Sequence, residues 1–360
     1  MEITMKKSIA YSLIAGMALL AASVSFTSCE KVSPTGVLIG NTSVDDRVKQ
    51  SMLYYYIHDN VLDKFLADSI KEYSFIVGSD SHITNDPGRL AEMIKIGIEN
   101  DDLFYCHLGD IADTKAEYYY NTRRVLEDAR VDWWEQKLVP FTDEYIVPED
   151  GLYIDPQTQQ IGHLLDFDLP FYPVVGNHDI THNGWSLYSD LFKTSFYEFT
   201  VATIMDGDTI NDRFIFLDSA NGTLGNYQID EIEKGVFSSD GKIIRHTFVF
   251  THTNIFRPSL NEFASTYCRE EMYYILDKLA DWNTSIMFYG HVHAWDRRIF
   301  GFVDHITMPS MNFVDHPDGG DDLLVRVTVK EDGTYKVEPV GLHCKERSKE
   351  ELIAEGFMVL

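Results

Sequence analysis

Aspartate, asparagine and histidine residues recur in short clusters along this chain, and every cluster directly follows an apolar run. The stretches concerned are YSFIVGSDSH, LFYCHLGDIAD, FYPVVGNHD, HTFVFTHTN and SIMFYGHVH. Carboxylate, amide and imidazole groups together suit Mn, Fe or Zn better than Ca or Mg. Two such ions about 3.5–4 Å apart can clamp the attacking and leaving oxygens of a phosphoryl transfer, given a bridging carboxylate. The candidate ligands are Asp80, His82, Asp110, Asn177, His252, His291 and His293.

The apolar runs indicate which elements must position these side chains. Continuous apolar runs of strand length predict strands that are buried on both faces. Between the first two runs lies RLAEMIKIGIEN, which predicts a crossover helix, so we expect a layered α/β fold. Ligand sites in open α/β sheets form beyond the carboxyl ends of the strands, and the polar clusters should therefore meet at one rim.

Taken in order, the clusters resemble the signature of the calcineurin-like metallophosphoesterases. The matching blocks are Asp80-Ser81-His82, Gly109-Asp110-Ile111-Ala112-Asp113, Gly176-Asn177-His178-Asp179, Thr251-His252 and Gly290-His291-Val292-His293. The resemblance spans residues 72–345. It implies a layered αββα sandwich with two central mixed sheets flanked by helices, and a site for two metal ions, Mn, Fe or Zn.

The resemblance also implies a role for each residue. The assignments are Asp80, His82 and His293 for the first metal, Asn177, His252 and His291 for the second, and Asp110 for both. His178 would be the general acid or would stabilise the transition state, with Asp113 fixing its orientation. The nucleophile would be a hydroxide that bridges the metals, and the substrate a small phosphomonoester or phosphodiester.

Other functions stay open beside hydrolysis of a phosphoester. The same fold could serve a lipoprotein that binds a phosphoglycan or a phospholipid, without turnover or with narrow specificity. A pyrophosphatase acting on nucleotide-like substrates is a further alternative. The chain has neither a G-x-S-x-G elbow nor a P-loop, which argues against serine-hydrolase and NTPase chemistry. Asp113 stands where the purple acid phosphatase branch has a metal-binding Tyr, so we do not assign the chain to that branch.

The N-terminal region predicts export and anchoring. Residues 1–28 combine two lysines, a long apolar run and small residues, as in a secretory signal peptide. Phe26-Thr27-Ser28-Cys29 resembles a bacterial lipobox, which would make Cys29 the lipidated N-terminus of a cell-envelope protein, periplasmic or on the outer surface. Residues 29–71 would then form a lipid tether and a helical segment, and Phe65 is among the apolar residues with helical spacing.

The rest of the chain divides into a main domain, an insert and a tail. The phosphoesterase domain spans residues 72–345, and its insert at about 114–168 begins with helical periodicity. Near the end of this domain, apolar and polar residues alternate around Asp332-Gly333, which predicts a hairpin. Residues 346–360 predict a C-terminal helix and tail.

Composition narrows the range of partners. Lys and Arg total 30 against 57 Asp and Glu, and the formal net charge is -27. Because no stretch gathers basic residues, we expect no nucleic acid partner. Cys106 lies in an apolar run and is expected in the core. Whether Cys268 pairs with Cys344 stays open, as do the substrate and the oligomeric state.

Overall fold

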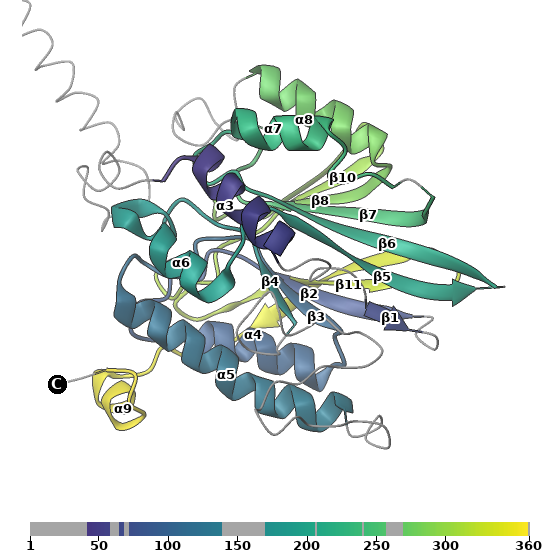
Figure 1. Ribbon diagram of the computed structural model, residues 1–360. Helices are drawn as coiled ribbons and strands as arrows, with labels where there is room; N and C mark the ends of the chain where they lie inside the picture. The colour runs from purple at the N-terminus through teal and green to yellow at the C-terminus, as the bar shows by residue number, and fades with distance from the viewer. Residues whose placement is uncertain are drawn as a thin grey trace, which may run out of the picture.

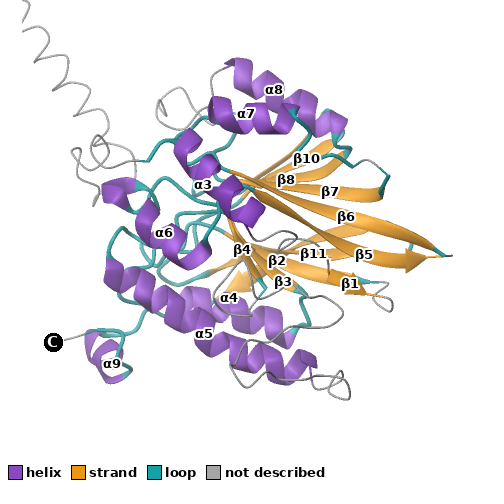
Figure 2. Cartoon of the chain, viewed as in Figure 1, coloured by secondary structure: helices purple, strands orange, loops and turns teal. Residues whose placement is uncertain are grey.

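The computed structural model describes residues 42–57, 65–67, 72–138, 170–205, 207–239, 241–256 and 269–358. Within these ranges the chain forms two mixed β-sheets packed face to face, with helices on both outer faces (Figures 1 and 2). The predicted layered α/β sandwich with two central mixed sheets is therefore confirmed. Cys29 and Cys268 lie outside the described residues, so the lipidation of Cys29 stays a prediction.

The larger sheet has seven strands in the order β1-β5-β6-β7-β8-β10-β9. Strands β6, β7, β8 and β10 run parallel to one another, while β5 pairs antiparallel with β6 and β9 pairs antiparallel with β10. The bounds are β1 Phe65–Ala67, β5 Tyr197–Met205, β6 Asp208–Leu217, β7 Ile243–Thr251, β8 Thr284–Tyr289, β9 Asp296–Phe300 and β10 Val303–Thr307.

The smaller sheet has five strands in the order β12-β11-β2-β3-β4. Strands β2, β3 and β4 are parallel, and β11 pairs antiparallel with β2 and with β12. The β11–β12 connection contains Asp332-Gly333, which confirms the predicted hairpin. The bounds are β2 Tyr73–Gly78, β3 Phe104–His107, β4 Phe171–Pro173, β11 Gly320–Val329 and β12 Tyr335–Leu342.

Helices complete the outer layers of the sandwich. Figure 1 shows α7 and α8 over the larger sheet, and α4 and α5 on the far side of the smaller sheet. Helix α4 is the predicted crossover helix, and α5 is the helical first half of the predicted insert. The bounds are α3 Val44–Ile57, α4 Gly88–Glu99, α5 Ala116–Leu138, α6 Trp185–Phe192, α7 Gly225–Glu233, α8 Arg269–Asp281 and α9 Lys349–Ala354.

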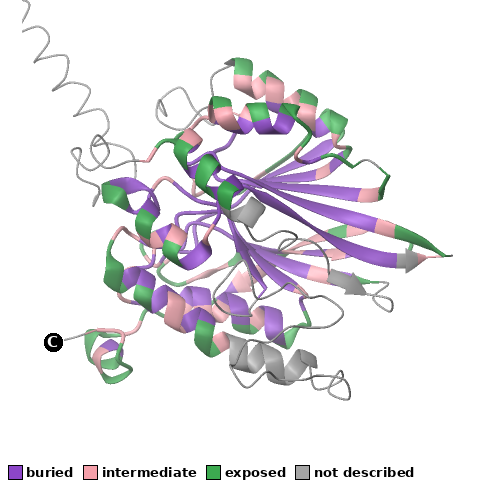
Figure 3. Cartoon of the chain, viewed as in Figure 1, coloured by how far each residue is buried: buried purple, intermediate pink, exposed green. Residues whose placement is uncertain are grey.

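The main core lies between the two sheets and is rich in phenylalanine. Phe75 of β2 stacks on Phe104 of β3 and meets Phe214 of β6 edge-on, with ring centroids 5.0 and 5.3 Å apart. Side chains alternate along a strand, so Phe214 faces this core while Ile215 faces the helices. Figure 3 shows both sheets buried along most of their length.

One predicted element differs from the structure. Helical spacing was expected to continue through Phe65, but α3 ends at Ile57, and Phe65–Ala67 is the short strand β1. Strand β1 pairs parallel with β5, with Phe65 opposite Val201. The edge of the larger sheet offers hydrogen-bond partners that spacing along the sequence cannot reveal. Among the described residues, no helix is long and apolar enough to cross a membrane.

Candidate metal centre

All the predicted ligands lie just beyond the carboxyl ends of strands, at the same end of the sandwich. Three of these strands belong to the smaller sheet and two to the larger one. The site therefore lies across the ends of both sheets, as expected for a layered α/β fold. Asp80 and His82 follow β2, Asp110 follows β3, Asn177 follows β4, His252 follows β7, and His291 and His293 follow β8.

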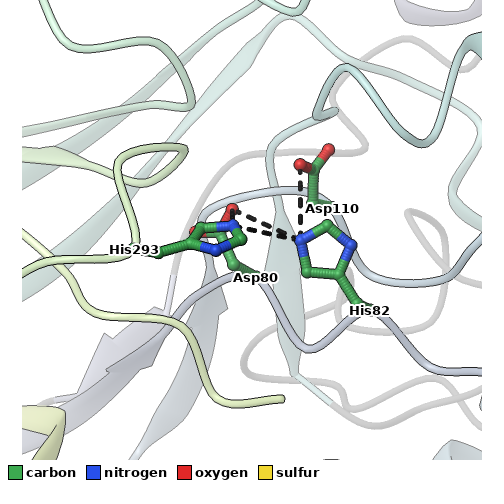
Figure 4. A group of neighbouring side chains, drawn as sticks. All are labelled: Asp80, His82, Asp110 and His293. Carbon is green, nitrogen blue, oxygen red and sulfur yellow. Dashed lines mark hydrogen bonds and ion pairs between the residues drawn. The ribbon is translucent and has the colours of Figure 1, made fainter. Parts of the chain in front are cut away.

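The first group of ligand atoms comprises Asp80, His82, Asp110 and His293 (Figure 4). One ligand atom from each residue lies within 4.8 Å of the others. The Nε2 atoms of His82 and His293 are 3.2 Å apart. His293 Nε2 is 3.3 Å from Asp80 Oδ1, and His82 Nε2 is 3.7 Å from Asp110 Oδ2. These four residues thus form one mixed nitrogen and oxygen donor set.

The second group comprises Asp110, His252 and His291, with Asn177 beside them. His252 Nε2 is 3.4 Å from Asp110 Oδ2, 3.0 Å from Asn177 Oδ1 and 3.2 Å from His291 Nδ1. The other ring nitrogen of His252 lies 2.7 Å from the Leu108 carbonyl. A carbonyl can only accept, so Nδ1 carries a proton and Nε2 is the nitrogen that can bind a cation.

These donor sets fit metal ions. In each group two imidazole nitrogens face each other at 3.2 Å beside a buried carboxylate. Imidazole nitrogens and carboxylates that converge in this way are suited to bind a shared cation. Mixed N and O donors of this kind suit Mn, Fe or Zn. All seven predicted ligands belong to these two groups or lie beside them, and their individual roles stay predictions.

The backbone at the site is held in an unusual conformation. Asp80, His82, Asp110, His291 and His293 have φ values of 52°, 42°, 51°, 68° and 56°, in the left-handed region that non-glycine residues rarely adopt. Such conformations cost on the order of 1–3 kcal/mol each and persist only where the surrounding structure enforces them. Their gathering at one set of strand ends makes this rim a candidate functional site.

Close approach of the loops depends on glycine. A Cβ at Gly176 would overlap the backbone nitrogen and side chain of Asp110. A Cβ at Gly290 would overlap the Ser79 hydroxyl and would lie 2.8 Å from Asp80 Oδ2. Only glycine lets the loops after β4 and β8 lie this close to the carboxylates.

The buried charges shift one another's pKa values. Burial alone would raise the pKa of Asp80, but the hydrogen bond and the charge of His293 bring it well below its usual range. Burial likewise opposes ionisation of Asp110, yet nearby His252 and His178 lower its pKa. Both carboxylates are therefore ionised near neutral pH, as metal ligands must be.

The imidazoles are shifted in different directions. Burial lowers the pKa of His291 to about 4, with a further contribution from His252, so this ring is neutral at pH 7. Burial would also lower the pKa of His252 and His293, but carboxylates raise them to about 9 and about 11. A proton held by these two rings occupies the place of a cation, so metal ions and protons compete for them.

His178 and Asp113 lie next to the first group. Asp113 Oδ1 is 3.5 Å from His178 Nδ1 and 3.6 Å from His82 Nδ1. The backbone N–H of His178 donates to Asp110 Oδ1 at 2.7 Å, which fixes the loop against the central carboxylate. Burial would raise the pKa of Asp113, but hydrogen bonds to His178 and His82 hold it below its usual range. The two side chains thus lie within reach of each other beside the first group, and their roles stay predictions.

Sequence reasoning gave no role to Asp179, although it belongs to the Gly-Asn-His-Asp block. Its carboxylate is fully buried and accepts from the Gly176 N–H at 2.8 Å, the Ile111 N–H at 3.1 Å and the Tyr119 hydroxyl at 2.6 Å. Burial raises the pKa of Asp179 to about 6, with a further contribution from Asp110. Asp179 ties together the loops after β3 and β4 and helix α5.

Sequence reasoning also gave no role to Asp315. Its Oδ2 lies 2.8 Å from His293 Nδ1, on the side of the ring that faces away from the metal ligands. No motif surrounds Asp315, and it is 22 residues from His293, so only the packing of the loop after β10 reveals the contact.

Comparisons with known proteins find solved structures that are similar to this chain. No protein-family model matches the chain, and no curated protein matches it. A dimetal phosphatase from Danio rerio is 12% identical with a TM-score of 0.44, covering 75% of this chain and 96% of that one. GAP50, the anchor in the inner membrane complex of Plasmodium, is 13% identical with a TM-score of 0.43, covering 79% and 93%.

A nucleotidase is also among the similar structures. The putative 5′-nucleotidase from Staphylococcus aureus is 13% identical with a TM-score of 0.39, and the match covers 79% of this chain and 58% of that one. At identities and TM-scores this low, the function of this chain has to be inferred from the geometry of its own site.

Proposed function

We propose that this protein is a phosphoesterase that depends on two metal ions. The observation that carries the proposal is the position of Asp110, whose Oδ2 lies 3.7 Å from His82 Nε2 and 3.4 Å from His252 Nε2. One buried carboxylate oxygen therefore reaches both groups of ligand atoms. A shared carboxylate between two nitrogen-rich donor sets is the arrangement of dinuclear hydrolytic centres.

Each group of ligands would hold one ion. When bound, the two ions would neutralise phosphate charge and supply hydroxide as the nucleophile. The chain's own contribution is to hold the donors in place before the ions arrive, through buried carboxylates and an enforced backbone. The first ion would bind Asp80, His82 and His293, the second Asn177, His252 and His291, and Asp110 would bind both.

His178 would donate a proton to the leaving group. Asp113 lies 3.5 Å from His178 Nδ1, so it would accept the Nδ1 proton and stabilise the protonated ring. The opposite nitrogen, Nε2, would then carry a proton that it can donate to the departing oxygen. The substrate would be a small phosphomonoester or phosphodiester.

The test is hydrolysis of a chromogenic phosphomonoester and a matching phosphodiester by the purified protein, with Mn, Zn or Fe added. We expect turnover that depends on metal. His178→Ala should lower kcat by about 10²–10⁴-fold while both metal ions stay bound. Asp110→Ala should lose both turnover and bound metal, because it removes the ligand common to both groups.

A matched control is His343→Ala, since His343 is exposed and pairs with Asp321 at 2.8 Å, outside the groups of ligand atoms. It should behave as the wild type does. Unchanged turnover in His178→Ala would refute the acid role. Two bound metal ions without turnover of either ester would instead favour the alternative of a binding protein.

A further inference from the structure

The carboxylate of Asp315 closes off one side of the His293 ring. Asp315 Oδ2 lies 2.8 Å from His293 Nδ1, while His293 Nε2 faces Asp80 Oδ1 at 3.3 Å and His82 Nε2 at 3.2 Å. A carboxylate at this distance accepts the Nδ1 proton, so the lone pair of the neutral ring lies on Nε2. The contact therefore selects the tautomer that a metal ion needs.

Asp315 is itself held in place by Asn312. The backbone N–H of Asp315 donates to Asn312 Oδ1 at 2.6 Å, and Asn312 Nδ2 donates to Asp315 Oδ2 at 3.1 Å. Asn312 is buried, whereas the Asp315 side chain is 32% exposed. The exposed acid is thus fixed by a buried amide and is not a freely moving surface charge.

The loop that carries Asp315 is attached to the strand end that carries Asp80. Ser310 Oγ donates to the Asp80 carbonyl at 2.9 Å, and the Met311 N–H donates to the Ser79 carbonyl at 3.0 Å. The buried guanidinium of Arg89 donates to the Met311 carbonyl at 3.2 Å and to the His316 carbonyl. The loop therefore connects two ligands of the first group, Asp80 and His293.

In the second group, the described residues place a backbone carbonyl, and not a carboxylate, behind His252. His252 Nδ1 donates to the neutral Leu108 carbonyl at 2.7 Å. A carboxylate makes the opposite ring nitrogen a stronger ligand than a carbonyl does, because its negative charge raises the electron density of the imidazole. The two metal positions therefore differ in the groups that support their ligands.

We propose that Asp315 is a positioning residue for the first metal ion, which it acts on through His293. This inference rests on the proposed two-metal function. Removing the charge of Asp315 should weaken the first position selectively, while the second position, supported by Leu108, keeps its ion. Loss of a partner of this kind typically costs about 10–100-fold in metal affinity.

The experiment measures Co²⁺ binding to the full-length protein by titration against a competing chelator, with absorption spectra recorded throughout. The variants are Asp315→Asn, which keeps the size of the side chain, and Asp315→Glu, which keeps its charge. The matched control is Asp318→Asn, which removes the same charge from an exposed position three residues away. His293→Ala and His252→Ala provide reference spectra for loss of each position.

We expect the wild type to bind two ions and Asp315→Asn to bind one of them about 10–100-fold more weakly. Its spectrum should match that of His293→Ala and not that of His252→Ala. Asp315→Glu should recover part of the lost affinity, and Asp318→Asn should behave as the wild type does. Circular dichroism of the metal-free variants verifies that they are folded.

Three outcomes would overturn the inference alone. These are wild-type affinity at both positions in Asp315→Asn, equal weakening in Asp318→Asn, and equal weakening of both positions in a folded Asp315→Asn protein. A wild-type protein that binds fewer than two ions would instead overturn the proposed function itself.

Discussion

Residues at the site have unusual backbone conformations and pack closely against one another. Asp80, Asp110 and His291 adopt positive φ values, and Gly176 lies against Asp110 with no room for a Cβ. The site is therefore sensitive to a single methyl group, because a small displacement of Asp110 changes the geometry of both donor sets.

We predict that Gly176→Ala displaces Asp110. It should destabilise the protein by about 1–3 kcal/mol, as overpacking does. Turnover should fall on the order of 100-fold, because misplacing a reactive group by about 1 Å costs about this much. Gly320→Ala is the control, since its Cβ would meet only ordinary contacts, with Leu323 at 3.4 Å or more. Equal turnover of the two variants would show that the approach of Gly176 to Asp110 is not required.

Among the elements, helix α3 shows how a segment remote in sequence supports the site. Its Arg47 is fully buried, and the guanidinium donates to the Asp218 carboxylate at 2.8 and 2.6 Å. Asp218 follows β6, and the neighbouring Ser219 accepts from the backbone N–H of Thr253 at 2.9 Å. Because Thr253 directly follows His252, α3 helps to fix the loop after β7.

We predict that Arg47→Ala lowers the free energy of unfolding by about 3–5 kcal/mol, because Asp218 would be left buried without its counter-charge. Urea denaturation measures the change. Lys336→Ala is the control, since Lys336 and Glu338 pair at 2.6 Å with side chains 60% and 44% exposed. Such an exposed pair contributes about 0–1 kcal/mol. A small effect of Arg47→Ala would mean that water reaches Asp218 in the variant.

At the scale of the whole molecule, the two sheets are joined by polar contacts at the end remote from the metal groups. Tyr73 of β2 donates its hydroxyl proton to Asp212 of β6 at 2.8 Å, and Arg245 of β7 donates to the same carboxylate at 2.9 Å. His246 Nε2 donates to the Gly333 carbonyl at 2.9 Å, in the turn between β11 and β12. These contacts join the two sheets at one end of the sandwich. The candidate metal ligands lie at the opposite end.

We predict that His246 makes stability depend on pH. Burial lowers its pKa below the ordinary value of about 6.5, although Asp212 partly opposes this. Below about pH 6.5 the unfolded chain binds a proton on His246 that the folded chain excludes. Above this pH, His246 therefore causes no loss of stability. As the pH drops from about 6.5 towards the pKa of His246 in the folded protein, the free energy of unfolding falls by at most about 1.4 kcal/mol per pH unit.

The comparison is between wild type and His246→Gln, both unfolded in urea with EDTA between pH 7.5 and 5. All other titratable groups are common to both proteins, so the difference between the two curves isolates His246. The curve of His246→Gln should be the less steep one. Parallel curves would show that His246 does not contribute.

Local patterns in the sequence predicted the strands that consist of a continuous run of buried apolar residues. The five runs before the polar clusters are strands β2, β3, β4, β7 and β8, and Asp332-Gly333 lies in a hairpin turn. The clusters also predicted the candidate ligands, because they directly follow strands and, taken in order, resemble a known family signature. Each of these features is encoded within about ten neighbouring residues, where periodicity reports burial directly.

Only the tertiary structure decided how distant segments meet. Phe65 was predicted to be helical, but the open edge of β5 made it part of a strand. Asp179 belongs to a local motif and Asp315 to none, but neither local sequence indicates the partner. Their contacts with Tyr119 and His293 cross 60 and 22 residues. Which nitrogen of His252 faces the ligands depends on a carbonyl 144 residues away. These contacts come from packing two sheets together, and no local spacing records that packing.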